Sequence, residues 1–338
     1  MESTTETINQ QSRNSNIEIL RILAIVLIVS MHLLGKVFNT TDFYHREFII
    51  GINAIGNIGV SIFVLISGFY GIKYKRSKVL TLINLVVFYS IASFIIKIFY
   101  LHHPIDFKSI TTNIFPIATN KYWFITSYII LTLLSPFINR FIENLSQKQY
   151  QKLLLIFAVF FVIAPTFLWV EILSDSGKGP INMLFLYLLG RYFAFYGFPN
   201  FIKLYPKVIM GACFCLIVAL NSLITNYFNN GIIMPFARDN NILIVLEAIC
   251  CFYAFLQWHF NSNTINYLAK YVFPIYILQS AVLHLFNIRE EAFFIDFTKS
   301  LFCTIAICIG IELIRRILLT GLFTKTQEIQ SKIIDKMV

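Results

Sequence analysis

Two ionisable residues, Arg21 and His32, interrupt the first long apolar run of the chain, at residues 16–32. Eleven positions separate them, and at about 100° per residue this spacing returns His32 to within about 20° of the Arg21 face, about 16 Å further along a helix. Such side chains are costly in lipid unless they face protein or a wet cavity. The pair therefore predicts a functional passage. The alternatives are a hydrogen-bonded structural histidine and an arginine that extends to the membrane surface.

Other polar residues accompany this pair. Glu18 lies three positions before the arginine, which is the spacing of a helical ion pair. In the second apolar run, Asn53 and Asn57 lie one helical turn apart, and Ser67 and Gly68 follow near its end. Small residues and amides let helices pack closely, and amides also present donors to a ligand. The sequence leaves both interpretations open.

The later apolar runs also contain or border charged and aromatic residues that could have a function. Trp123 opens the fourth run, where the default interpretation is an aromatic belt at the outer membrane surface. Arg191 and Glu247 interrupt two other runs, and a structural pair between them is as compatible with the sequence as catalysis. A basic cluster after the second run either holds topology or meets a cytoplasmic ligand with several phosphates. Its members are Lys73, Lys75, Arg76 and Lys78.

The elements that position these residues are transmembrane helices. The chain is 57% hydrophobic and 13% charged, with a mean hydropathy of +0.72. Runs long enough to cross a membrane predict an all-α polytopic protein of about ten helices. We expect 1–15 to be a disordered N-terminus, 16–322 a transmembrane domain and 323–338 a C-terminal tail. The expected helices are 17–38, 48–71, 79–101, 121–142, 150–171, 181–198, 206–228, 241–260, 267–288 and 300–322.

Lys and Arg concentrate in alternate connections, which predicts that both termini are cytoplasmic. This orientation puts Arg21 near the cytoplasmic surface and His32 in the outer half of the membrane. The net charge of +10 is explained by the same topology and by contact with anionic membrane lipid, so it indicates no nucleic-acid binding. No phosphate-binding loop, dinucleotide fingerprint, nucleophile elbow or metal-ligand spacing is evident, and we expect neither a bound cofactor nor a metal.

The sequence resembles membrane-bound acyltransferase family 3, whose members are integral membrane O-acyltransferases of cell-envelope glycans. The resemblance covers about 16–322. One departure from many members is Gln279, which stands where they have a histidine at the end of the motif 275–280. The residues that carry the resemblance are the segment 16–24 with Arg21 and His32, the segment FVLISGF at 63–69 and the segment YWFI at 122–125.

The resemblance implies transfer of an acyl group, usually acetyl, from cytoplasmic acyl-CoA to a hydroxyl of a cell-surface polysaccharide or its lipid-linked precursor. His32 would be the catalytic base, Arg21 would hold the donor or the site, and Ser67, Gly68 and Trp123 would shape the passage. The basic cluster would meet the CoA phosphates. Direct attack by the acceptor and an acyl-histidine intermediate both remain open. The resemblance also leaves room for a separate extracytoplasmic or glycan-assembly partner.

Two other classes compete with the acyltransferase. One is a transporter or flippase for a glycan or a small metabolite, in which His32 and Glu247 would relay protons. The other is a catalytically inactive regulatory relative, against which the presence of both Arg21 and His32 argues.

Overall fold

The computed structural model describes residues 14–40, 42–102, 104–228 and 231–335. The chain is 80% helical, and no strand occurs in these described ranges. The all-α prediction is therefore confirmed. Of the N-terminal segment expected to be disordered, residues 1–13 lie outside the described residues, and the first helix begins at Ser15.

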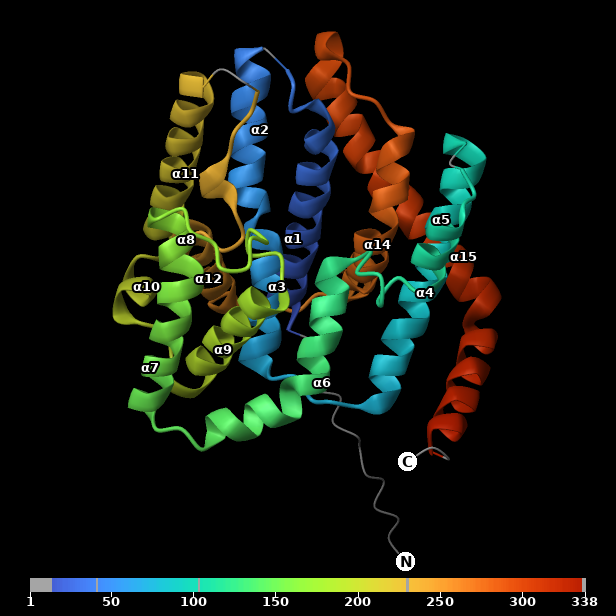
Figure 1. Ribbon diagram of the computed structural model, residues 1–338, viewed down its shortest axis with the longest axis horizontal. Helices are drawn as coiled ribbons and strands as arrows, with labels where there is room; N and C mark the ends of the chain where they lie inside the picture. Colours follow the sequence, from blue (N-terminus) through green and yellow to red (C-terminus); the bar gives the residue numbers. More distant parts are fainter. Residues whose placement is uncertain (1–13, 41, 103, 229–230, 336–338) are drawn as a thin grey trace, which may run out of the picture.

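The helices form one bundle (Figure 1). Short helices and turns connect the longer ones, and a π-helical turn at Val159–Ile163 joins α7 to α8. The bounds of the helices are α1 Ser15–Leu34, α2 Phe43–Gly56, α3 Ile58–Tyr70, α4 Arg76–Leu101, α5 Phe107–Ile114, α6 Trp123–Glu143, α7 Gln147–Ala158, α8 Ala164–Phe167, α9 Pro180–Tyr196, α10 Asn200–Leu204, α11 Pro206–Phe228, α12 Ile242–Leu256, α13 Asn263–Leu268, α14 Val272–Val282 and α15 Phe293–Asp335.

Among the described residues, seven helical segments are long and apolar enough to cross a membrane. Each corresponds to one of the ten expected spans, and helices also occupy the other three ranges. Two of those three, α9 and α12, have 17 and 15 residues, which is fewer than the about 20 that a helix normal to the bilayer needs. The third, α15, continues to Asp335, past the expected end of the last span at 322.

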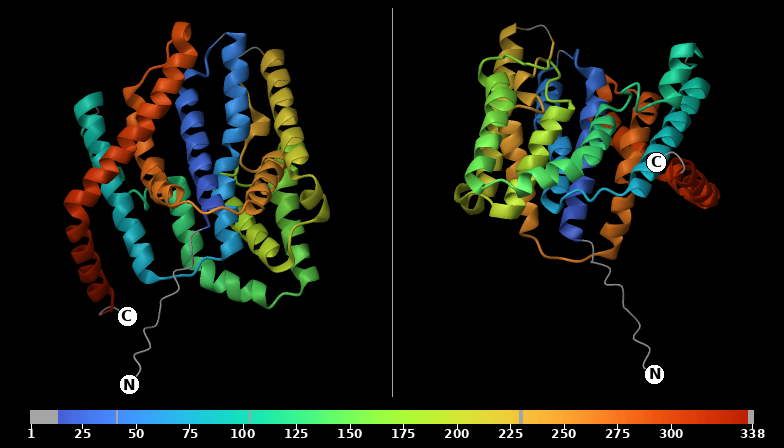
Figure 2. Two further views of the ribbon diagram at one scale, coloured as in Figure 1. Left: turned by 180° about the vertical axis from the view of Figure 1, so that it is seen from behind. Right: turned by 60° about the horizontal axis from the view of Figure 1, so that its bottom comes forward.

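Helix α1 lies in the middle of the bundle and packs against α2, α3, α12, α13, α14 and α15 (Figure 2). One apolar core joins α1 to α3, α9 and α12, and a second joins it to α4, α14 and α15. The start of α1 and the end of α15 lie at the same end of the bundle, which we call the N-terminal end. The central position of α1 brings both of its ionisable residues within reach of several helices.

The second apolar run is a single span, Phe43–Tyr70, as expected, and a one-residue turn at Asn57 divides it into α2 and α3. The Asn57 Nδ2 donates to the Asn53 carbonyl at 2.7 Å, and the Asn53 Nδ2 donates to the Ile49 carbonyl at 2.9 Å. The Asn53 carbonyl also accepts from the Asn57 backbone nitrogen at 3.1 Å, so helical hydrogen bonding continues up to the turn. A Cβ on Gly59 would lie 2.8 Å from Ile28 Cγ1, so this glycine allows α3 to pack tightly on α1.

Candidate active site

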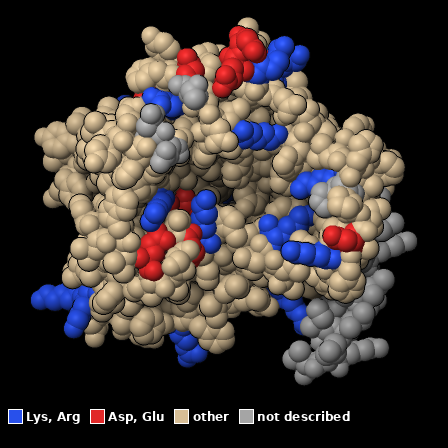
Figure 3. Space-filling model, turned by 45° about the horizontal axis from the view of Figure 1, so that its top comes forward, with Lys and Arg blue, Asp and Glu red and all other residues tan. Residues whose placement is uncertain are grey.

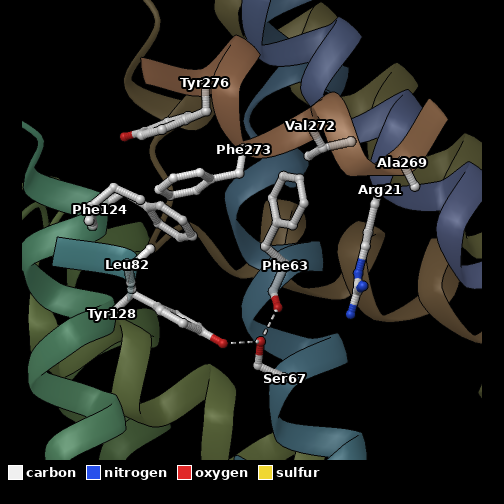
Figure 4. Close-up of a pocket in the computed structure, with 11 residues that line it drawn as sticks. Arg21, Phe63, Ser67, Leu82, Phe124, Tyr128, Ala269, Val272, Phe273 and Tyr276 are labelled. Atoms are coloured by element: carbon white, nitrogen blue, oxygen red, sulfur yellow. Dashed lines mark hydrogen bonds between the residues drawn. The ribbon is translucent and has the colours of Figure 1, made fainter. Parts of the chain in front are cut away.

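A cavity of about 290 Å³ lies beside Arg21, and we call it the Arg21 cavity (Figure 4). The Arg21 guanidinium and the hydroxyls of Ser67 and Tyr128 lie toward one end of it, and Tyr276 lies at the other. Aromatic and aliphatic side chains from α3, α4, α6 and α14 cover the remaining walls. The cavity therefore offers a cation and hydroxyls to one part of a ligand and an apolar surface to another.

Two interactions hold the polar end of the Arg21 cavity. The Arg21 Nη1 lies 3.2 Å from Glu18 Oε1, and the arginine side chain is 36% exposed while the glutamate is 8% exposed. The predicted ion pair is thus present and leaves part of the guanidinium accessible. The Ser67 hydroxyl donates to the Phe63 carbonyl at 2.8 Å and lies 3.3 Å from the Tyr128 hydroxyl. Ser67 therefore lines the Arg21 cavity, and the passage role that the family resemblance implies for it stays a prediction.

His32 faces a second, smaller space of about 40 Å³, which we call the His32 pocket. Its imidazole is accessible from this space although protein surrounds it on most sides. The polar and aromatic residues around it come from five parts of the chain. They are Asn57, Trp123, Lys178, Asp239 and Tyr276. Trp123 therefore lines this pocket; the residues alone favoured an aromatic belt for it, and the family resemblance implied a place in the passage.

Gln279 approaches the imidazole of His32 from α14. The glutamine is only 1% exposed. Its Nε2 donates to the Tyr276 carbonyl at 3.2 Å, whereas its Oε1 is buried and has no hydrogen-bond partner among the described residues. A buried amide oxygen without a partner is costly. Gln279 thus offers an acceptor beside His32.

Two connections that contact each other bring Lys178 and Asp239 to the His32 pocket. Lys178 belongs to the connection between α8 and α9, and Asp239 to the connection between α11 and α12. Glu171 and Arg238 form a 2.9 Å ion pair between the segments. Gly177 has a φ of 81°, and a Cβ there would lie 2.5 Å from the Asn240 nitrogen, so only glycine fits this close approach. Both segments lie far from α1 in sequence, and neither residue belongs to a motif. Sequence reasoning therefore missed them.

The Asp239 side chain is only 2% exposed. Burial raises the pKa of this carboxyl to about 7, an effect that the nearby Lys178 cation opposes and the Asp175 carboxylate reinforces. Asp239 consequently changes charge near neutral pH, in a pocket that also contains an imidazole. Groups that titrate near the working pH are characteristic of enzyme sites.

Several residues singled out in the sequence lie elsewhere. Gly68 packs against α9, where its Cα lies so close to Gly190 that neither position has room for a Cβ. Asn53 takes part in the α2–α3 break. Neither of them lines either cavity. Among the basic cluster, Lys73, Lys75 and Lys78 are exposed and Arg76 is half-buried.

Arg191 and Glu247 do not pair with each other among the described residues. The Arg191 guanidinium stacks over the Phe195 ring at 4.3 Å and lies against Gly71, at the end of α3. Glu247 is 1% exposed, lies near the cysteines of α11 and α12, and lines neither cavity. The structural pair suggested by the sequence is therefore absent, because the two side chains belong to different surroundings.

Tyr276 lines both the Arg21 cavity and the His32 pocket, so one side chain separates the two spaces. The described residues include no group of three or more histidine, cysteine, aspartate or glutamate side chains that could hold a metal ion. The arrangement thus provides an anchoring cation in one space and a proton acceptor in the next.

These features define a polytopic helical membrane protein with ionisable residues of one helix in two adjoining cavities. A family model described as an acyltransferase domain matches residues 14–313. The chain belongs to acyltransferase family 3 and is a membrane acyltransferase. Comparison with curated proteins gave no match. Comparison with solved structures gave none either.

Proposed function

We propose that the enzyme transfers an acetyl group from cytoplasmic acetyl-CoA to a hydroxyl of a cell-surface polysaccharide or its lipid-linked precursor. The observation that carries this proposal is the adjacency of the Arg21 cavity and the His32 pocket on either side of Tyr276. Membership of the acyltransferase family supports group transfer over the transport of an unmodified ligand.

The donor enters from the N-terminal end of the bundle in this proposal. The basic cluster lies there, at the start of α4, and the excess of Lys and Arg in the connections at this end supports a cytoplasmic location. A guanidinium binds phosphate through paired hydrogen bonds, which suits Arg21 to a CoA phosphate. The apolar walls of the Arg21 cavity then accommodate the pantetheine arm.

The chemical step uses His32 as a general base. Its imidazole takes the proton of the acceptor hydroxyl while that oxygen attacks the thioester carbonyl. The tetrahedral intermediate then collapses, the carbon–sulfur bond breaks, and the imidazolium returns its proton to the CoA thiolate. The Lys178 ammonium beside the pocket stabilises the oxyanion of the intermediate.

A kinetic comparison of two variants tests these roles. Purified protein in lipid nanodiscs would receive radiolabelled acetyl-CoA and a glycan extract from its host. We expect His32→Ala to lower kcat by about 10²–10⁴-fold, as general-base catalysis predicts. Arg21→Gln should mainly raise KM for acetyl-CoA. His259→Ala, which removes an exposed histidine outside both cavities, is the matched control.

The same assay separates the alternatives. Full transfer by the His32→Ala variant would refute the assignment of the base. A stable acetyl group on His32, detected by mass spectrometry without acceptor, would replace direct attack by an acyl-enzyme route. In cells, proton NMR of the surface glycan should show acetyl signals that are lost in both the deletion strain and the His32→Ala strain. Unchanged acetylation in the deletion strain would refute the glycan acetyltransferase proposal for that strain.

A further inference from the structure

A cavity of about 310 Å³ opens between α4 and α5, at the end of the bundle opposite the N-terminal end. We call it the lysine pocket. Three lysines line it, Lys97 from α4, Lys108 from α5 and Lys121 from the segment that leads into α6. Ser109, Thr112 and Asn113 add hydroxyl and amide groups. Figure 3 shows several separate groups of charged side chains on this end of the molecule.

None of the three lysines forms an ion pair with an acid among the described residues. Asp106 also lines the pocket, but its carboxylate accepts from the Ser109 nitrogen at 2.6 Å and caps α5. The lysine pocket thus gathers more positive charge than the carboxylate within it can balance.

Lys121 is held in place rather than extended into solvent. Its half-buried Nζ donates to the Ser90 hydroxyl at 2.8 Å and to Asn113 Oδ1, and it lies 5.0 Å from the centre of the Tyr122 ring. Burial, together with the Lys97 charge, lowers the pKa of Lys121 to about 8. A bound anion would relieve this repulsion, and an oriented ammonium costs little further entropy when it binds.

The side chains around the lysine pocket are suited to contact with a membrane surface. Helix α5 exposes Phe107, Ile110 and Ile114, and Phe115 follows it with its ring also exposed. A short helix with exposed apolar side chains beside lysines is suited to the boundary between headgroups and acyl chains. If the anion bound in the lysine pocket is a lipid headgroup, its acyl or isoprenoid tail would therefore reach the bilayer along α5.

The start of α6 links the lysine pocket to the His32 pocket. Lys121 is followed by the buried Tyr122 and then by Trp123, which lines the His32 pocket. A ligand held by Lys121 thus has one end near the acceptor side of the active site. This places the three lysines where the substrate, rather than an unrelated ion, would pass.

We propose that the lysine pocket binds the phosphate that joins the acceptor glycan to a lipid carrier, so that the lipid-linked precursor, and not the finished polysaccharide, is the acceptor. This inference rests on the proposed function for the identity of the acceptor. Lysines bind phosphate as point charges, and the hydroxyl and amide groups of the pocket supply further donors. The lipid tail lies along α5, and the sugar extends toward His32.

Binding of a short-chain probe tests the inference without turnover. Purified protein in phosphatidylcholine nanodiscs would be titrated with farnesyl phosphate, and the dissociation constant measured by microscale thermophoresis. We expect Lys121→Gln to weaken binding by about tenfold, the effect of one charge-assisted contact. Lys108→Gln removes an exposed ammonium group that makes no hydrogen bond among the described residues, so it should weaken binding as well and is less prone to disturb folding. Binding should also weaken as pH rises above about 8, where Lys121 loses its proton.

Three controls decide the outcome. Lys299→Gln removes an exposed lysine that does not line the lysine pocket and should leave binding unchanged. Farnesol, which lacks the phosphate, should bind weakly and equally to all variants. The same affinity for farnesyl phosphate in wild type, Lys108→Gln and Lys121→Gln would overturn the inference. So would equal competition by phosphatidylglycerol, because the pocket would then be a general lipid headgroup site.

The binding assay with farnesyl phosphate tests the lysine pocket independently of the proposed catalytic role of His32. His32→Ala protein should bind farnesyl phosphate as tightly as wild type, because His32 does not line the lysine pocket. Loss of acetyl transfer with retained binding would support both assignments. Retained transfer in His32→Ala, together with lysine-dependent binding, would refute the base and leave the lysine pocket standing.

Discussion

The close approach of α3 and α9 predicts that Gly68→Ala destabilises the protein. A Cβ on Gly68 would lie 2.4 Å from the Tyr187 carbonyl oxygen and 3.0 Å from the Gly190 Cα. The first distance is about 1 Å shorter than ordinary van der Waals contact. Both neighbours are backbone atoms in a helix, so a side-chain rotation cannot relieve the clash.

The magnitude follows from two opposing effects. Overpacking of this kind costs about 1–3 kcal/mol, and alanine in place of glycine gains about 1 kcal/mol in a helix. Because the clash is with backbone atoms, its cost lies at the upper end of that range, so the net loss is about 1–2 kcal/mol, or about 1–3 °C in Tm for a chain of 338 residues. Gly211→Ala is the matched control, because Gly211 also lies inside an apolar helix but has no neighbour within 4 Å of a Cβ.

Thermal unfolding of both variants in one detergent, followed by circular dichroism, measures this difference. Gly68→Ala should unfold at lower temperature than wild type, and Gly211→Ala at the same or a higher temperature. Because α3 also carries Ser67 into the Arg21 cavity, the first variant should raise KM for the donor too. If Gly68→Ala is as stable as wild type or more stable, the packing argument is refuted. A role of Gly68 in the ligand passage would then be the better interpretation.

Three further results are expected. Gln279→Leu removes the acceptor beside His32 and should lower kcat by about tenfold, with KM for the acyl donor unchanged; a kcat equal to that of wild type would contradict this role. Because burial raises the pKa of Asp239 to about 7, wild type should lose stability relative to Asp239→Asn as pH rises from about 4 to about 7, which Tm measurements across this interval would test. Glu247→Gln should retain wild-type kcat and KM in the transfer assay, since Glu247 lines neither cavity, and lost activity would instead favour a proton relay.

The sequence predicted those features that depend on local pattern. Apolar runs located the helices, and the family resemblance was confirmed by the match over residues 14–313. The ion pair of Glu18 and Arg21 followed from helical spacing. The functional roles of Arg21 and His32 remain predictions, although the structure puts each beside a cavity.

Other features depend on contacts between distant segments. Lys178 and Asp239 reach the His32 pocket because the connection between α8 and α9 contacts the connection between α11 and α12. The ion pair of Glu171 and Arg238 joins these two connections. The sequence could not show whether Gly68 packs against another helix or lines a ligand passage, because a small residue is suited to both. The structure places it against α9. The turn at Asn57 was likewise hidden, because apolar residues continue through it.

In the proposed reaction, the acyl group passes Tyr276, a residue of α14 that lines both the Arg21 cavity and the His32 pocket. Arg21 and His32 are carried by one continuous helix, so the distance between the donor anchor and the base is fixed by helix geometry. Helix α1 is also held on several sides by its neighbours. Tyr276 is only half-buried and lines both spaces, and rotation of its ring needs no change in α1. The acyl group would therefore reach His32 when Tyr276 turns aside, while the anchoring end of the donor stays at Arg21.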